Sequence, residues 1–352
     1  MASALAACGS SRAEHGAHPQ THEPPPVDSA ARSEPTTPAP RPEPVVLGAF
    51  ERERLADVDR VVGFGVFAGA VVAVADTFEE ALLFNRDATG WTRRKLGSRT
   101  VDAIAAGTDQ LALVRHATDG SSEVELLSTD GTYRSAGFLS SSGEVHLARG
   151  GGVLIAAYRG KNPGEVLVVR RSETSDQPFE ALGTLRLQAG FALTVDGSGV
   201  AHVVGRSVDA TGLVHAVLSP GHIEEIAADR TLEGLDLAVC AGTPHAVLLR
   251  PDRTVALARW GASAWEDIGP AIRGPLGLGQ LLFDPSCRAL LLADGAIWAH
   301  GPTGWKRAGD PNIGHDAATA IADDERVYIA HRRARDGGGG FEVWIASAPI
   351  QR

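Results

Sequence analysis

The stretch AIWAHGPTGWKRAG, residues 296–309, contains the pattern that decides the fold of this protein. A short and mainly apolar run ends in a Gly-Pro-Thr-Gly turn, Trp305 follows the turn, and a glycine stands four positions after that tryptophan. A β-patterned run followed by a glycine-rich turn is typical of two antiparallel strands joined by a hairpin. The stretch therefore predicts a β-hairpin whose second strand begins at Trp305.

The same pattern recurs along the chain with a regular period. An aromatic residue precedes a glycine by four positions in four places and by six positions at Trp91, and two further members keep the phase without the glycine. The seven members, about 40 to 46 residues apart, are Phe50, Trp91, Tyr133, Phe179, Ile223, Trp265 and Trp305. This spacing is the length of a four-stranded propeller blade, so the period predicts seven blades.

The strands of each unit can be placed around these residues. A β-patterned run stands before every member except the first, and we expect these runs to be third strands, at residues 81–85, 123–127, 165–170, 214–218, 254–260 and 296–300. Two further apolar runs separated by a turn lie upstream of each, as in residues 191–195 and 200–204. Their near-continuous apolar composition fits inner strands that neighbouring blades cover on both faces.

The two ends of the repeat predict how the ring closes. The last unit has a third strand at residues 341–346 and no fourth, whereas residues 44–55 hold a fourth-strand sequence around Phe50 and no blade of their own. Pairing these segments would remove two exposed sheet edges. We therefore expect an all-β protein, a seven-bladed β-propeller whose last blade is closed by the N-terminal strand. The alternatives are a six-bladed propeller with one degenerate unit and two β-sandwiches, which leave the period unexplained.

Composition limits the partners and divides the chain. The net charge is −10 and the chain has only three lysines, so no basic stripe is available for nucleic acid. No run approaches the roughly 18 to 20 consecutive apolar residues of a membrane-spanning helix. We expect a proline-rich tether over residues 1–43 and the propeller over residues 44–352, acting as a monomer without nucleic-acid partners.

The N-terminus reads Leu5-Ala6-Ala7-Cys8 and precedes about 35 residues rich in Pro, Ala, Ser, Thr and Glu, which is typical of a solvated tether. This start resembles the lipobox of bacterial lipoproteins. The resemblance implies a lipid on Cys8 as the only membrane contact and a place on the bacterial cell envelope, facing the periplasm or the exterior. Residues 1–7 lack the complete basic and apolar regions of a signal peptide. The gene start is therefore expected upstream, with a chance cysteine as the alternative.

Two further cysteines lie in the propeller. Alignment of the fifth and sixth units places Cys240 at the end of one innermost strand and Cys287 in the turn after the equivalent strand of the next unit. A disulfide between them requires Cα atoms within about 7 Å and is favoured in an oxidising compartment. A Cys240–Cys287 disulfide and two separate, partly buried thiols both remain open.

The turn Ser128-Thr129-Asp130-Gly131-Thr132-Tyr133 resembles a shortened Asp-box of sialidases and related repeat propellers. In that family such turns are structural, so the resemblance supports the propeller and implies no activity. A sialidase also needs a tyrosine nucleophile with a glutamate partner, and this chain has only three tyrosines and no Arg-Ile-Pro motif. We therefore expect no catalytic residues, no cofactor and no metal site, and we expect Trp91, Trp265 and Trp305 to pack between blades.

The sequence leaves two classes of function open. The favoured one is a non-enzymatic binding or scaffold propeller that holds a protein, peptide or glycan at one mouth of the central channel. The alternative is a glycan-active hydrolase or lyase in the same channel. Charged and aromatic residues recur after the second strands, and they are the candidate ligand-binding set: Arg115, His116, Tyr158, Arg159, Arg206, Arg250, His331 and Arg332.

Overall fold

The computed structural model of the protein divides the chain into two compact units, Met1–Pro40 and Arg41–Arg352. The residues that the structure describes all belong to the second unit. They are residues 45–351 except 56, 78, 117–120, 142, 209–211, 228–232, 262, 274–278, 312, 314–316 and 335–340. The Cys8 and tether predictions therefore lie outside the described residues.

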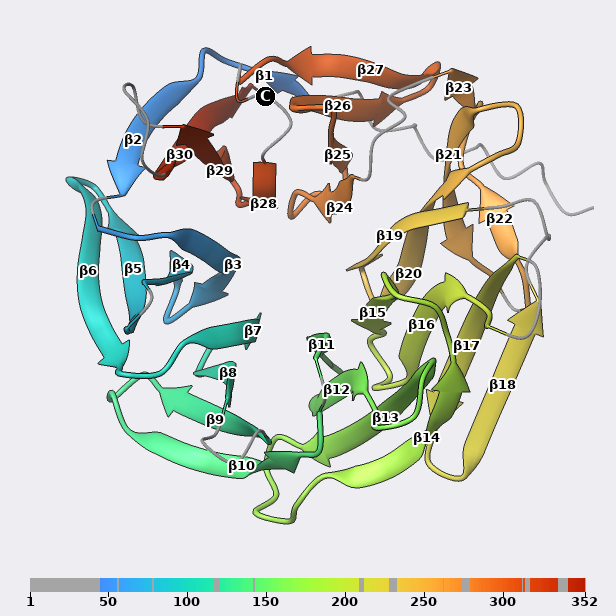
Figure 1. Ribbon diagram of the computed structural model, residues 1–352. Helices are drawn as coiled ribbons and strands as arrows, with labels where there is room; N and C mark the ends of the chain where they lie inside the picture. The colour runs from blue at the N-terminus through green and yellow to red at the C-terminus, as the bar shows by residue number, and fades with distance from the viewer. Residues whose placement is uncertain are drawn as a thin grey trace, which may run out of the picture. The chain divides into compact units, whose positions relative to one another are not determined.

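The described residues form a seven-bladed β-propeller, as the sequence predicts (Figure 1). Every blade is an antiparallel sheet, and consecutive strands within a blade pair with each other. The blades are numbered here in chain order from β3. All regular elements in the described part are strands, and no helix there is long and apolar enough to cross a membrane.

The first four blades follow one another without interruption. Blade 1 contains β3 (Arg60–Phe67), β4 (Ala70–Asp76), β5 (Ala81–Asp87) and β6 (Gly90–Gly97). Blade 2 contains β7 (Val101–Ala106), β8 (Gln110–His116), β9 (Ser122–Ser128) and β10 (Tyr133–Leu139). Blade 3 contains β11 (Val145–Gly150), β12 (Val153–Arg159), β13 (Glu165–Ser172) and β14 (Glu180–Arg186). Blade 4 contains β15 (Ala192–Val195), β16 (Ala201–Arg206), β17 (Leu213–Ser219) and β18 (His222–Ala227).

The last three blades contain the two departures from regularity. Blade 5 contains β19 (Glu233–Cys240), β20 (Thr243–Leu249), β21 (Thr254–Trp260) and a divided fourth strand, β22 (Trp265–Asp267) and β23 (Ile272–Arg273). Blade 6 contains β24 (Gln280–Phe283), β25 (Ala289–Ala293), β26 (Ala296–Gly301) and β27 (Gly304–Gly309). Blade 7 contains β28 (Ala317–Ala322), β29 (Arg326–Ala334) and β30 (Phe341–Gln351), and is completed by β1 (Val46–Leu47) and β2 (Glu51–Leu55).

The ring is closed by the N-terminal segment, which confirms the predicted pairing. Strand β2 runs antiparallel to β30, with Arg52 opposite Ala346 and Leu55 opposite Val343. Strand β1 pairs further along β30, where Leu47 lies opposite Ile350. The last strand extends to residue 351, beyond the predicted 341–346, because β1 provides it with a second partner. The innermost strands also contact one another around the ring, and β28 contacts β3.

The repeated glycine has a structural cause. In blades 1, 2, 3 and 6 the fourth strand bulges just before that glycine, so the preceding residue has no partner on the third strand. The bulged residues include Leu96 and Leu182, whose side chains are buried. A bulge inserts one residue and bends the strand, and glycine tolerates both.

The glycine also leaves room for the next member of the repeat. A Cβ on Gly183 would overlap Ile223 Cδ1 of the following blade, and a Cβ on Gly309 would lie 2.7 Å from Phe50 Cε2. Gly137 stands in the same relation to Phe179, at 3.5 Å. The period in the sequence therefore arises from a contact between successive blades. Phe50 makes that contact across the ring closure.

The tryptophans pack between blades as predicted. Trp91 lies 5.8 Å from the ring of Tyr328 in blade 7, and Trp305 is buried among apolar residues of blades 5 and 6. Trp265 of blade 5 lies 4.9 Å from the His215 ring of blade 4. Buried aromatic rings contribute large apolar areas, so these contacts stabilise the junctions between blades.

Candidate functional site

The predicted ligand-binding residues lie on one face of the ring, since each stands at or after the end of a second strand. In an antiparallel meander that end meets the start of the innermost strand, as in the pairing of Val101 with Arg115 and of Ala317 with His331. The structure thus distributes the set over five of the seven blades, one or two residues in each of these, and does not gather them into one cluster.

Two of these residues connect structural elements. The Arg115 side chain is buried: its Nε donates to Glu125 Oε2 at 2.7 Å, and Nη1 and Nη2 donate to the carbonyls of Arg99 and Leu96 at 2.8 and 3.1 Å. It therefore ties blade 1 to blade 2. His116 is half exposed, and its Nε2 lies 2.9 Å from Asp102 Oδ2.

The remaining members differ in burial and partners. Tyr158 is buried between blades 2 and 3, and His331 is buried on β29. Burial, with the positive charge of Arg52, lowers the pKa of His331 to about 4, so this ring is neutral at pH 7. Arg250 forms an ion pair with Asp267, Arg332 lies over the Phe341 ring at 4.1 Å, and the Arg206 side chain is exposed at the end of β16.

Arg159 belongs to a cluster near the axis of the ring, here called the axial cluster: Glu144, His146, Arg159, Phe191 and Asp236. Glu144 Oε1 lies 3.0 Å from His146 Nε2, and Glu144 Oε2 accepts from Arg159 Nε and Nη2 at 3.1 Å each. Phe191 packs against both side chains, with its ring centroid 4.5 Å from the His146 ring and 5.1 Å from the Arg159 guanidinium. The cluster is therefore held in one arrangement by charge and by stacking.

Asp236 enters the axial cluster from blade 5. It lies on the innermost strand β19, and its Oδ2 accepts a hydrogen bond of 2.9 Å from the backbone N–H of Leu281 in blade 6. Desolvation raises its pKa to about 6, although the backbone N–H groups of Leu237 and Leu281 and the charge of His146 act in the opposite direction.

The two carboxyl groups of the axial cluster differ in protonation. Burial alone would raise the pKa of Glu144, but His146 and Arg159 outweigh burial, and the pKa is lowered. Glu144 is thus a carboxylate that accepts hydrogen bonds, whereas Asp236 still carries a proton in part of the molecules near pH 6. The cluster therefore offers hydrogen-bond donors and hydrogen-bond acceptors, and its charges largely compensate one another.

Sequence reasoning identified Arg159 and missed Glu144, His146 and Asp236. Glu144 and His146 are separated by one residue at the start of an innermost strand, which places both side chains on one face. Asp236 interrupts an apolar strand sequence. A charged residue in such a run is a signal that could have been used.

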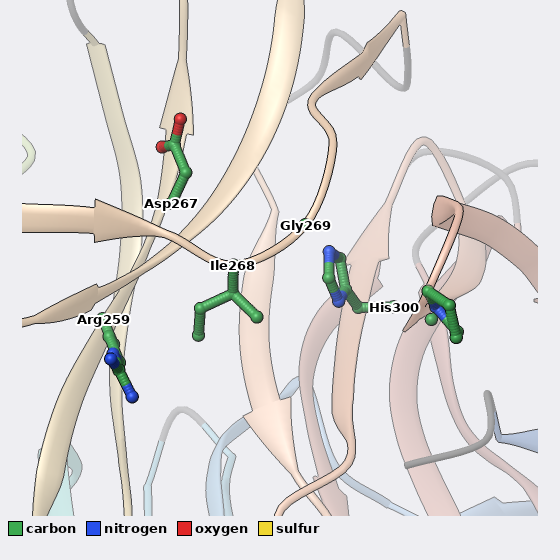
Figure 2. Close-up of a pocket in the computed structure, with 7 residues that line it drawn as sticks. Arg259, Asp267, Ile268, Gly269 and His300 are labelled. Carbon is green, nitrogen blue, oxygen red and sulfur yellow. The ribbon is translucent and has the colours of Figure 1, made fainter. Parts of the chain in front are cut away.

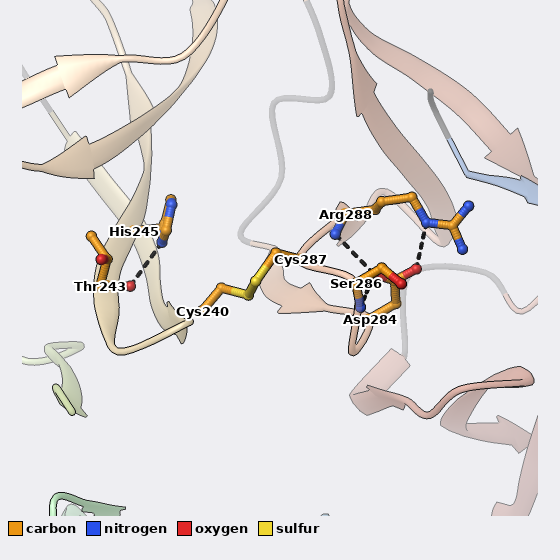
Figure 3. Close-up of a disulfide and its surroundings, with 7 residues drawn as sticks. All are labelled: Cys240, Thr243, His245, Asp284, Ser286, Cys287 and Arg288. Carbon is orange, nitrogen blue, oxygen red and sulfur yellow. Dashed lines mark hydrogen bonds and ion pairs between the residues drawn. A yellow bond between two sulfur atoms is a disulfide. The ribbon is translucent and has the colours of Figure 1, made fainter. Parts of the chain in front are cut away.

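Cys240 and Cys287 form a disulfide between blades 5 and 6, with Cα atoms 5.7 Å apart (Figure 3). Cys240 ends β19, and Cys287 lies in the turn after β24 with a φ of +61°. Asp284 shapes that turn, because its Oδ1 accepts from the backbone N–H groups of Ser286 and Arg288 at 3.0 and 2.8 Å. The disulfide joins the inner ends of the two blades.

A pocket of about 300 Å³ lies at the outer edge of the same junction (Figure 2). Ile268 and Gly269 from the break in the fourth strand of blade 5 form one wall, and His300 and Pro302 from blade 6 form the other. Asp267 and Arg259 lie at its rim. Among the described residues, no group of three or more His, Cys, Asp or Glu side chains is arranged to hold a metal ion.

Comparison with known proteins supports the fold alone. No protein-family model and no curated protein matches the sequence. An oligogalacturonate lyase from Vibrio parahaemolyticus superposes with a TM-score of 0.57 at 8% identity, covering 87% of this chain and 98% of that chain. The WD40 domain of a coronin from Toxoplasma gondii gives a TM-score of 0.51 at 12% identity and covers 88% and 90%. A fucose-specific lectin from Aleuria aurantia gives 0.46 at 12% identity, covering 74% and 97%.

Proposed function

We propose that this protein is a non-enzymatic binding propeller of the bacterial cell envelope, and that it holds a glycan at the axial cluster. The arrangement of charge in that cluster supports the proposal. Its arginine and histidine are already paired with Glu144, so they give the site directional hydrogen bonding without a free charge. Hydroxyl groups match such a set, because each can donate to a carboxylate and accept from a ring N–H.

The partners of the tyrosines argue against a sialidase-like activity. Tyr133 donates to the carbonyl of Leu96 at 3.0 Å, while Tyr158 and Tyr328 are buried. No tyrosine hydroxyl in the described residues is hydrogen bonded to a glutamate. A glycan-active hydrolase or lyase is the second candidate, because Glu144 and Asp236 have pKa values displaced in opposite directions, as acid and base pairs require.

An envelope location is part of the proposal, with the lipid carried by Cys8. The Cys240–Cys287 disulfide supports it, since disulfides persist in oxidising compartments outside the cytoplasm. Growth with an alkyne-bearing fatty acid should label the wild-type protein and leave Cys8→Ser unlabelled. Labelling of the serine variant, or none of the wild type, would rule out this anchor.

The binding proposal can be tested with full-length Cys8→Ser protein on an array of bacterial and plant glycans. We expect binding that is lost in His146→Ala and retained in His116→Ala, a histidine also paired with a carboxylate but outside the axial cluster. Equal loss in both variants, or no bound glycan, would contradict the proposal. Release of shortened products that ceases in Asp236→Asn would instead establish the hydrolase or lyase.

A further inference from the structure

The pocket between blades 5 and 6, here called the seam pocket, exists because a strand is broken. Strand β22 ends at Asp267, Ile268 N–H still donates to the Leu257 carbonyl at 2.7 Å, and pairing resumes only at Ile272 with Val255. Four residues, 268–271, therefore face only two on β21. One of them is Pro270, which has no N–H to donate to a sheet.

At other blade junctions, a side chain of the next blade fills the space that corresponds to the seam pocket. Ile223 occupies the space beside Gly183, and Phe50 occupies the space beside Gly309. At the equivalent Gly269 the nearest side-chain atom is His300 Cε1, 3.2 Å from an added Cβ. Trp305, the repeat member expected there, lies with its ring 5.0 Å from that of His300 and is buried. At this junction the His300 ring, and not the repeat member Trp305, thus lies against the glycine, and the pocket opens beside these two residues.

Charged groups at the rim of the seam pocket compensate one another. Asp267 forms an ion pair with Arg250, and Arg259 donates to Glu266 Oε2 from Nε at 3.0 Å and from Nη2 at 2.9 Å. A charged ligand would therefore find no unpaired countercharge. Burial lowers the pKa of His300, although a hydrogen bond to the backbone of Ile268 acts in the opposite direction, so the ring is neutral at pH 7 and Nε2 is the ring nitrogen without a partner.

The remaining lining residues of the pocket are apolar or glycine, which suits contact with the C–H groups on the face of a small ring. Ile268 and Pro302 line the pocket with apolar atoms, and Gly269 and Gly301 expose backbone. Ligand pockets begin at about 300 Å³, which here limits the occupant to a single small ring. A pyranose combines the required features, because its hydroxyls lie around the edge while its C–H groups form an apolar face.

We propose that the seam pocket binds one neutral pyranose residue, with Ile268 and Pro302 against its carbon face and His300 and Asp267 hydrogen bonded to its hydroxyls. This site lies at the outer edge of the ring and is separate from the axial cluster. It does not depend on the function proposed for that cluster. A glycan bound at both places would be held more tightly than at either alone.

The test uses the full-length Cys8→Ser protein and saturation-transfer NMR with methyl α-pyranosides of glucose, galactose, mannose, fucose and N-acetylglucosamine. We expect at least one to bind with a dissociation constant on the order of 1 mM and to shift the His300 ring resonances. Methyl α-glucuronide should bind at least about tenfold more weakly than the neutral sugar, because of its uncompensated charge.

Variants separate this site from the axial cluster. Gly269→Ala places a methyl group against His300, and His300→Ala removes the hydrogen-bonding ring; each should weaken binding at least about tenfold. Gly221→Ala is the matched control: its φ of +71° is close to the +73° of Gly269, and an added Cβ meets nothing within 4 Å. It should bind as the wild type does.

Several results would overturn the proposal. They are the absence of any bound pyranoside, tighter binding of the glucuronide, and wild-type binding by a folded Gly269→Ala. Binding that is lost in His146→Ala and kept in His300→Ala would move the sugar to the axial cluster, which contradicts this proposal and leaves the proposed function intact. Should Gly269→Ala fail to fold, the His300 resonances of the wild type decide the matter.

Discussion

At the junction of blades 3 and 4, Ile223 fills the space beside Gly183, whereas at the junction of blades 5 and 6 the space beside Gly269 is a pocket of about 300 Å³. The first junction is closed by apolar packing along its outer edge, among Val168, Leu182, Leu185 and Leu218. The second is also packed, among Leu257, Leu291 and Trp305, and is held in addition at its inner edge by the Cys240–Cys287 disulfide and by the hydrogen bond from Leu281 to Asp236. The difference shows that a covalent link accompanies packing at the junction where a strand is broken.

The largest effect is expected on removal of the disulfide. Cys240 and Cys287 are 47 residues apart, and a link that closes a loop of this length stabilises a protein by roughly 3 to 5 kcal/mol. The double variant Cys240→Ala/Cys287→Ala should lose about this much free energy of unfolding in urea. Cys8→Ser should lose none. A double variant as stable as the wild type would show that packing alone holds blades 5 and 6 together.

A smaller effect is expected from an added methyl group at the closed junction. Gly183→Ala forces the tip of the Ile223 side chain to move, and because that side chain is 42% exposed the cost is about 1 kcal/mol, at the low end for overpacking. The variant Gly183→Ala/Ile223→Ala should recover much of the loss, because the shortened side chain no longer reaches the added Cβ. Chemical denaturation of the two variants and of Ile223→Ala completes the cycle. Additive costs would contradict the contact between the repeat positions.

The smallest effect concerns the carboxyl group at the open junction. The pKa of Asp236 is raised to about 6 in the folded protein, above its ordinary 3.8, so its contribution is greatest at low pH and is lost as pH rises through 6. Asp236→Asn keeps an acceptor for Leu281 and should be more stable than the wild type at pH 7.5, by less than about 1 kcal/mol for this partly exposed group.

The measurement is the urea midpoint of Asp236→Asn and of the wild type at pH 3.5, 5.5 and 7.5. The difference should be smallest at pH 3.5, where the carboxyl is protonated in the folded protein and mostly protonated in the unfolded chain. An identical pH dependence of the two proteins would mean that Asp236 does not titrate in this range.

Much of the fold could be predicted because the same types of residue recur at equivalent positions of each repeat. The expected third strands begin within one residue of those observed, as with residues 254–260 and β21, since a two-residue period and a glycine turn act locally. The closure of the ring also followed, because an unpaired strand at each end has one natural partner. The candidate site was predicted less well: of the axial cluster, only Arg159 was named.

The sequence by itself determined the number of blades, the order of strands and the closure by residues 44–55, because periodicity and turn residues are local properties of the chain. Only the tertiary structure decided that Glu144 pairs with His146 and Arg159, and that a pocket lies between Gly269 and His300. The pocket depends on distances between blades. Such distances arise from the twist and spacing of whole sheets, and no single segment of the chain specifies them.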